Sequence, residues 1–211
     1  MSASSPAIRA VPFAVVPAAG KSERMGRPKL ALPLGPRSVL EHTVQTLRDA
    51  GVPHVLVVVG PHLPELVPLA ERAGAQVLQL TQPTPDMRGT VEAGLRVLEE
   101  VFHPNADDGW LLVPADHPVL DVTAIRELLA APRRHPDCSL FVPTYAGRRG
   151  HPALLAWRHV PEIRALPVPQ GLNAYLRQHA AVLAEVPVSS PSVLVDLDTP
   201  DDYDRLLRGL W

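Results

Sequence analysis

Short apolar runs alternate with amphipathic segments along the first half of this chain, and this alternation restricts the possible fold more than any other feature. Four runs rich in Val and Leu end at Gly or Pro, a pattern typical of buried strands. They cover residues 12–18, 54–60, 75–80 and 109–115. Segments of helical period separate them. Strands that alternate with helices form a mainly parallel sheet with helices on both faces. We therefore predict an α/β protein with three layers, α/β/α, around a Rossmann-like, mixed but mainly parallel sheet.

The best-defined helical segment is residues 38–51. Ser38 and Glu41 have the spacing of a capping box, and Gly51 supplies a stop signal. Two further segments, 89–102 and 122–131, have the same helical period. A fourth, residues 62–73, is helical in pattern but contains Pro64 and Pro68, which leaves its start open.

The second half of the chain is less regular. The strand-like segments at 138–145 and 151–157 flank the sequence AGRRG and could pair through that loop. The remaining elements expected there are a helix at 171–179, a strand at 181–188 and a helix at 199–210 whose cap is Thr199. No repeat or linker divides the chain, so we expect a flexible N-terminus over residues 1–10 and one domain over 11–211.

Composition excludes several classes of function. At 211 residues the chain suits one packed domain, and a net charge of −2 offers no overall basic field for nucleic acid. No apolar run reaches the roughly 20 residues of a membrane span. The single cysteine, Cys138, cannot form an internal disulfide, which fits a reducing cytoplasm. We expect a cytoplasmic protein that binds neither nucleic acid nor membranes.

The letters GKS after the first apolar run raise the question of a P-loop. A P-loop requires G-x-x-x-x-G-K-[ST], and with Lys21 as its lysine the first glycine would stand at position 15. That position is Val15, so the P-loop interpretation fails.

A different kind of phosphate loop remains possible between residues 20 and 29. In an open parallel sheet, ligands bind beyond the carboxyl ends of the strands, and this loop follows the first strand. Gly20 and Gly26 would let backbone N–H groups approach phosphate oxygens, and Arg24 and Lys29 would add charge-assisted contacts. The alternative is a solvated surface loop with incidental cations.

Acidic residues follow two other strand-like segments. Asp116 ends the fourth apolar run and is placed to hold Mg²⁺, which prefers a few carboxylates together with phosphate oxygens. The alternative for Asp116 is that it caps a turn. Asp196 and Asp198 precede the last helix, and one of them could complete the metal site. Asp201 and Asp202 belong to the first turn of that helix, where its dipole favours them.

Other chemistries lack their residues. The chain contains neither the G-x-S-x-G elbow nor a G-x-G-x-x-G fingerprint, and its nine histidines show no zinc spacing. A basic loop with two separated acidic sites suits transfer between phosphates, in which positioning and charge neutralisation supply most of the catalysis.

Five motifs in this order resemble those of the MobA-like NTP transferases, whose fold is the nucleotide-diphospho-sugar transferase type. The first, PAAGKSERMGRPK, resembles the A-A-G-x-S-x-R-M-G-x-x-K signature and is the specific one. The others are PDMRGTVEAGL, PADHPVL, RRGHPALL and VDLDTPDDY. Within that family the chain is most similar to the branch of molybdenum cofactor cytidylyltransferase.

The resemblance implies attack by an acceptor phosphate on the α-phosphorus of an NTP, with release of pyrophosphate. It implies CTP as the donor, molybdopterin as the acceptor, Mg²⁺ as the cofactor and a possible molybdoenzyme partner. Arg24, Lys29 and Asp116 would be catalytic, and Asp116 would bind metal with Asp196 or Asp198. The nucleotide would be bound by Ala18, Ala19, Gly20, Arg24, Gly26, Lys29, Thr90 and Gly94. The acceptor would be bound by Gly150, His151, Pro152 and Gly171.

One segment departs from the family pattern. The branch carries G-D-x-G-x-R before the last helix and strand, whereas residues 168–174 read VPQGLNA, which keeps only Gly171. The segment lies on the expected acceptor side, so two alternatives stay open. The acceptor could be a sugar or alditol phosphate, or the chain could be a non-catalytic, chaperone-like nucleotide-binding partner of a molybdoenzyme.

Overall fold

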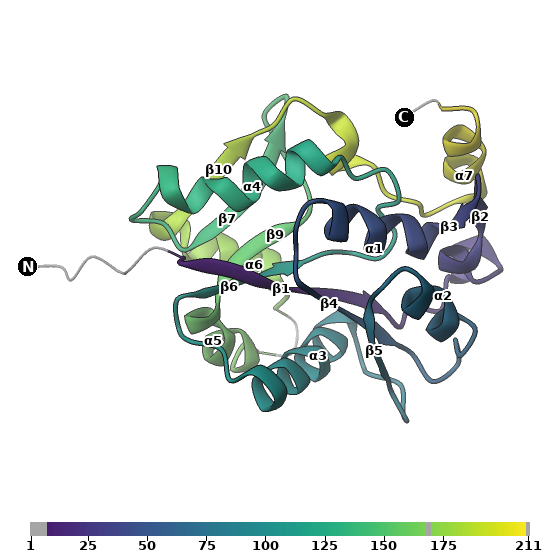
Figure 1. Ribbon diagram of the computed structural model, residues 1–211, viewed down its shortest axis with the longest axis horizontal. Helices are drawn as coiled ribbons and strands as arrows, with labels where there is room; N and C mark the ends of the chain where they lie inside the picture. The colour runs from purple at the N-terminus through teal and green to yellow at the C-terminus, as the bar shows by residue number, and fades with distance from the viewer. Residues whose placement is uncertain (1–7, 168–169, 210–211) are drawn as a thin grey trace, which may run out of the picture.

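A computed structural model describes residues 8–167 and 170–209 of the chain, and its centre is one eight-stranded sheet (Figure 1). The strands run in the order β10-β7-β9-β6-β1-β4-β5, and β8 pairs with β7. In this sheet β9 runs antiparallel to β6 and β7, and β8 runs antiparallel to β7, whereas the other described pairings are parallel. The strands are β1 (Ala10–Ala18), β4 (His54–Val59), β5 (Gln76–Gln79), β6 (Asp108–Leu112), β7 (Leu140–Tyr145), β8 (Arg148–Arg149), β9 (Ala153–Ala156) and β10 (Leu183–Pro187).

Helices cover both faces of this sheet, which confirms the predicted three-layer fold (Figure 1). The alternation of side chains along β1 divides the core: Ala14 and Val16 pack on one face, and Phe13 and Val15 on the other. The first face carries α1 (Val39–Asp49), α2 (Leu66–Arg72), α4 (Val122–Arg134) and α7 (Pro200–Leu207). The second carries α3 (Met87–Phe102), α5 (Val160–Arg164) and α6 (Leu172–Gln178).

Local signals explain where the helices begin. The capping box of α1 is present, since Ser38 Oγ accepts from Glu41 N and Glu41 Oε2 accepts from Ser38 N. α2 begins at Leu66, after Pro64, and contains Pro68 within its first turn, where backbone N–H groups have no intrahelical partner. α7 begins with Thr199 as its cap.

Some short elements have no signal in the sequence pattern. A two-stranded hairpin, β2 (Pro33–Leu34) with β3 (Arg37–Ser38), leads into α1. α5 and several 3₁₀ turns were not predicted either, because one or two turns are too short to display a helical period. The predicted pairing of residues 138–145 with 151–157 is present, with Leu140 opposite Leu155.

The N-terminal segment predicted to be flexible lies outside the described residues up to position 7. Ile8 is buried in the core and Arg9 N donates to Asp107 O (3.0 Å), so packed structure begins before residue 11. The assignment of residues 11–211 to a single domain stays a prediction. Within the described residues, no helix has both the length and the apolar character to cross a membrane.

A chain of polar side chains joins α5 and α6 to the sheet. His159 is buried, with Nε2 2.8 Å from Ser139 Oγ and Nδ1 2.7 Å from Tyr175 OH. Tyr175 OH donates to Glu162 Oε2 (2.9 Å), which also lies 3.1 Å from His179 Nε2. Burial, with the nearby His179 and Arg158, lowers the pKa of His159 to about 4.

The lowered pKa of His159 predicts that the folded protein loses stability in acid. Its folded pKa lies below the unfolded value, so the unfolded state binds more protons and stability falls as pH drops from about 6.5 towards 4. Between pH 7 and 4.5 we expect wild type to lose about 2 kcal/mol more unfolding free energy than His159→Gln. Urea unfolding at both pH values measures this difference, and equal losses in the two proteins would contradict it.

Candidate active site

A pocket of about 490 Å³ opens beyond the carboxyl ends of β1 and β6. These two strands are parallel neighbours, with Val15 opposite Leu112. From β1 the chain crosses to β4 on one side, while β6 lies on the other, so the pocket occupies a switch point of the sheet. Open α/β sheets bind ligands at such points. The sequence placed the phosphate loop and Asp116 at this same edge.

The loop after β1 is held in shape by its own residues. Met25 is buried in the core beneath it, and Ser22 Oγ accepts a hydrogen bond from Lys29 N (3.3 Å). Gly26 has a φ of 62°, in the left-handed region, where it ends the 3₁₀ turn Glu23–Met25. The loop therefore presents its cations from an anchored backbone.

Lys29 lies at the centre of the acidic residues. Its ammonium donates to Asp116 Oδ2 (2.7 Å), to Asp198 Oδ1 (2.9 Å) and to Leu197 O (2.7 Å). The side chain is 15% exposed, so these bonds are partly shielded from water. Burial acts to lower the pKa of Lys29, but the two carboxylates outweigh it and the pKa is raised.

Arg24 contacts Asp198 as well. Its guanidinium nitrogen lies 2.9 Å from Asp198 Oδ2, the oxygen that Lys29 does not contact. The hydrogen bond from Lys29, aided by Arg24, keeps the pKa of Asp198 below its usual value. Two carboxylates and two cations thus form one cluster that joins the loop after β1, the end of β6 and the segment before α7.

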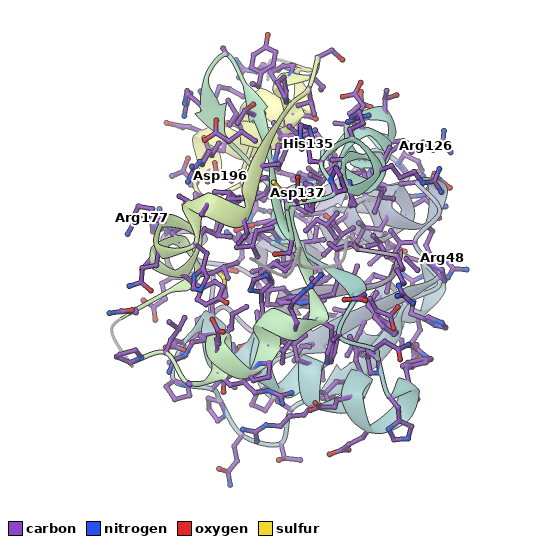
Figure 2. The ribbon with its side chains drawn as sticks, turned by 90° about the vertical axis from the view of Figure 1, so that its left-hand side faces the viewer. Arg48, Arg126, His135, Asp137, Arg177 and Asp196 are labelled. Carbon is purple, nitrogen blue, oxygen red and sulfur yellow. The ribbon has the colours of Figure 1, made fainter. Side chains whose placement is uncertain are left out.

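Asp196, the alternative metal ligand, acts on His151, where its negative charge opposes the lowering of that histidine's pKa. It is exposed and is not among the residues that line the pocket, whereas Asp116 and Asp198 are. In Figure 2 its label lies on the same half of the view as Arg177, opposite Arg48 and Arg126 of the α1–α4 side. The structure therefore brings Asp116 together with Asp198 rather than with Asp196.

Most of the predicted nucleotide-binding residues line the pocket. They are Ala18, Ala19, Gly20, Arg24, Lys29 and Thr90. Thr90 is buried, with its hydroxyl 2.6 Å from that of Thr84.

Two glycines predicted to bind nucleotide are not among the lining residues. Gly26 forms the turn described above. Gly94 packs against the sheet: a Cβ there would lie 2.9 Å from Val58 Cγ2 and 3.0 Å from Val15 Cγ1. The close approach of α3 to the sheet accounts for Gly94 without a ligand.

The predicted acceptor residues Gly150, His151 and Pro152 lie beside β9. His151 packs against His117, the residue after Asp116, with ring centroids 5.1 Å apart. Both rings have a buried Nδ1 without a hydrogen-bond partner. Burial lowers both pKa values, that of His151 to about 4, so both imidazoles are neutral at pH 7. Gly171, the fourth predicted residue, caps α6 and lines a small apolar cavity of about 110 Å³.

Sequence reasoning missed several lining residues. His62 and Thr84 come from loops outside the five motifs, whereas Asp86 and Met87 stand at the start of α3, inside the PDMRGTVEAGL motif but without a predicted role. The Leu197 carbonyl could not be found from side-chain patterns, because it is a backbone group.

Arg88 was also missed. It donates from α3 to Leu166 O (2.7 Å) and Pro167 O (3.0 Å), which ties the loop before α6 to the helix that borders the pocket. The unusual pair Val168–Pro169 of that loop lies outside the described residues.

The donor set fits a divalent cation that is held in part by its substrate. Asp116 and Asp198 both line the pocket, but in the described part of the chain no three acidic, histidine or cysteine side chains form a metal cluster. Mg²⁺ is commonly bound by one or two carboxylates together with substrate phosphates, and two carboxylates beside an open pocket match that pattern.

A family model for the MobA-like NTP transferase domain matches residues 14–182 of the sequence. The chain belongs to this family. The match includes the loop after β1, Asp116 and the segment with His151. We therefore interpret the geometry of the site as that of a MobA-like NTP transferase domain. It ends before Asp198, whose place in the cluster comes from the tertiary structure.

One curated relative and two solved structures are similar to the chain over nearly its whole length. The purine catabolism protein PucB of Bacillus subtilis is 28% identical over 207 residues, which cover 92% of this chain and 94% of PucB. Rv0371C of Mycobacterium tuberculosis, solved in complex with manganese, superposes with a TM-score of 0.74 at 24% identity over 93% of this chain and 97% of its own. A CMP:2-keto-3-deoxy-manno-octonic acid synthetase complexed with CTP has a TM-score of 0.72 at 15% identity, over 95% and 98% of the two chains. The two structures show the same fold.

Proposed function

We propose that this protein is a Mg²⁺-dependent cytidylyltransferase that transfers CMP from CTP to a phosphate-bearing small molecule, with molybdopterin as the acceptor. The observation that carries the proposal is the contact of Lys29 with Asp116 and Asp198, all three of which line a pocket of about 490 Å³. CTP as donor is supported by the likeness of the fold to a synthetase that was solved with CTP. The divalent cation is supported by the manganese complex of Rv0371C.

In this proposal the protein binds and orients both substrates. Arg24, Lys29 and the backbone around Gly20 hold the triphosphate, and the segment from Thr84 to Thr90 contacts the base. When bound, Mg²⁺ supplies neutralisation of the charge on the phosphates. Asp116 and Asp198 would hold it. An oxygen of the acceptor phosphate forms a bond to the α-phosphorus, and the bond to the bridging oxygen of pyrophosphate breaks.

The acceptor side contains no group that has to remove a proton. A phosphate acceptor is anionic at neutral pH, so it attacks without a general base. The imidazoles of His117 and His151 are neutral and lie next to Asp116 in sequence or in space, where they offer hydrogen bonds rather than charge. A sugar or alditol phosphate would satisfy the same chemistry.

The experiment is pyrophosphate release from CTP, GTP, UTP and ATP, each with molybdopterin, with a panel of sugar and alditol phosphates, and without acceptor. Release with CTP and molybdopterin that depends on Mg²⁺ is the expected result. Release with a sugar phosphate but not with molybdopterin would identify the sugar phosphate as the acceptor. Release with another NTP but not with CTP would identify that NTP as the donor. Nucleotide binding with no release for any pair would overturn the enzyme assignment in favour of a binding partner of a molybdoenzyme.

A further inference from the structure

The position of Lys29 implies a restriction on when the metal can bind. All three N–H bonds of its ammonium point to oxygens: Asp116 Oδ2 at 2.7 Å, Asp198 Oδ1 at 2.9 Å and Leu197 O at 2.7 Å. A divalent cation shared by Asp116 and Asp198 would lie between the two carboxylates, where the ammonium now lies. Lys29 and the metal therefore compete for the same ligands.

The charges of the cluster lead to the same conclusion. Asp116 and Asp198 carry two negative charges, and Lys29 and Arg24, both in contact with Asp198, carry two positive charges. The cluster has no net charge with which to attract a dication. A lysine at 15% exposure beside two carboxylates loses much of their attraction if a cation displaces it without supplying another partner.

A nucleotide changes this balance. Its triphosphate carries negative charge and many oxygens, and it enters a pocket that both Lys29 and Arg24 line. The ammonium can then exchange its carboxylate partners for phosphate oxygens at little electrostatic cost. Asp116 and Asp198 become free for the metal, which gains phosphate ligands at the same time.

We propose that Lys29 occupies the metal position in the nucleotide-free protein, so that the divalent cation binds only together with the nucleotide. The inference rests on the proposed function, because it assumes that Asp116 and Asp198 are the metal ligands of a nucleotidyltransferase. It adds an order of binding and gives Lys29 two alternating sets of partners, the carboxylates and the triphosphate.

The test is titration of the nucleotide-free protein with Mn²⁺, with free Mn²⁺ followed by electron paramagnetic resonance. We compare wild type with Lys29→Met, which keeps the length of the side chain and removes its charge. The control is Lys21→Met, which removes an exposed cation of the same loop. Wild type and Lys21→Met should bind Mn²⁺ only weakly, and Lys29→Met should bind it at least about tenfold more tightly. Adding Asp198→Asn to Lys29→Met should abolish the gain.

Three results would overturn the inference. One is Mn²⁺ binding by Lys29→Met that is no tighter than that of wild type, in a protein with an unchanged circular dichroism spectrum. Another is a gain that persists with Asp198→Asn, which would place the ion elsewhere. A third needs no variant: micromolar Mn²⁺ binding by the nucleotide-free wild type, which also decides the matter if Lys29→Met does not fold.

These outcomes are separate from those of the proposed function. The Mn²⁺ titration contains no nucleotide and no acceptor, so it measures only the competition between Lys29 and the metal. Failure of the proposed function would appear as an absence of pyrophosphate release from any NTP. Tight Mn²⁺ binding by Lys29→Met, together with an absence of turnover by the wild type for every NTP and acceptor, would support the inference and reject the enzyme assignment.

Discussion

Asp116→Ala should lower kcat for pyrophosphate release by about 1,000-fold, the scale of loss expected when a group that stabilises transition-state charge is removed. Asp116 follows the end of β6, lines the pocket and accepts a hydrogen bond from Lys29 (2.7 Å). The substitution removes a proposed metal ligand and leaves Lys29 with one carboxylate instead of two. Steady-state kinetics at saturating Mg²⁺ and NTP measure the effect, and circular dichroism checks that the fold is retained.

The informative comparison is between Asp198→Ala and Asp196→Ala. Asp198 belongs to the cluster and should lose activity on the scale of Asp116, whereas Asp196 is exposed and outside the pocket and should retain activity within about threefold of wild type. The sequence offered these two aspartates as equal alternatives. A large loss for Asp196→Ala with little loss for Asp198→Ala would refute the metal site described here. Survival of turnover in Asp116→Ala would do the same.

Gly150→Ala should destabilise the fold strongly. A Cβ on Gly150 would lie 2.8 Å from the Val193 carbonyl carbon and still closer to its oxygen. Both atoms belong to the backbone of Val193, and the neighbouring His151 N donates to the same Val193 O (2.8 Å), so neither segment can move without losing a hydrogen bond. We expect a loss of about 3 kcal/mol in the free energy of unfolding, the upper end of what overpacking costs.

Urea unfolding of purified protein measures this loss. Gly171→Ala is the matched control, because a Cβ there has no atom within 4 Å and the φ of −92° suits any residue. It should change the free energy of unfolding by less than about 0.5 kcal/mol. Similar stabilities for wild type and Gly150→Ala would show that the segment at Val193 shifts freely, and would return Gly150 to a role in ligand binding alone.

Much of the fold could be predicted from the sequence because the signals for its strands and helices are local. The strands ending at Ala18, Val59 and Leu112 are buried on both faces over most of their length, so each carries an apolar run that stands out from the helices around it. The capping box of Ser38 and Glu41 defined the start of α1 to the residue. The order of the strands in the sheet could not be predicted from the sequence, since the pairing of β1 with β4 and β6 joins segments that are far apart in the chain.

The glycines show where residue type alone misleads. Gly20, Gly26 and Gly94 were all predicted to bind the nucleotide, but of these three only Gly20 lines the pocket. Gly26 serves a left-handed turn and Gly94 a close helix–sheet contact. A missing Cβ has several uses, and only the neighbouring atoms distinguish them.

By itself, the sequence determined the layered α/β fold, the family and the edge of the sheet at which the site lies, because periodicity, caps and ordered motifs are properties of neighbouring residues. Only the tertiary structure decided that Asp198 rather than Asp196 joins Asp116, and that Lys29 lies between them. These groups come from positions 87 and 169 residues away from Lys29 in the chain. Which of two nearby aspartates faces the pocket depends on how the segment before α7 packs against β6 and the loop after β1, and no local pattern records that packing.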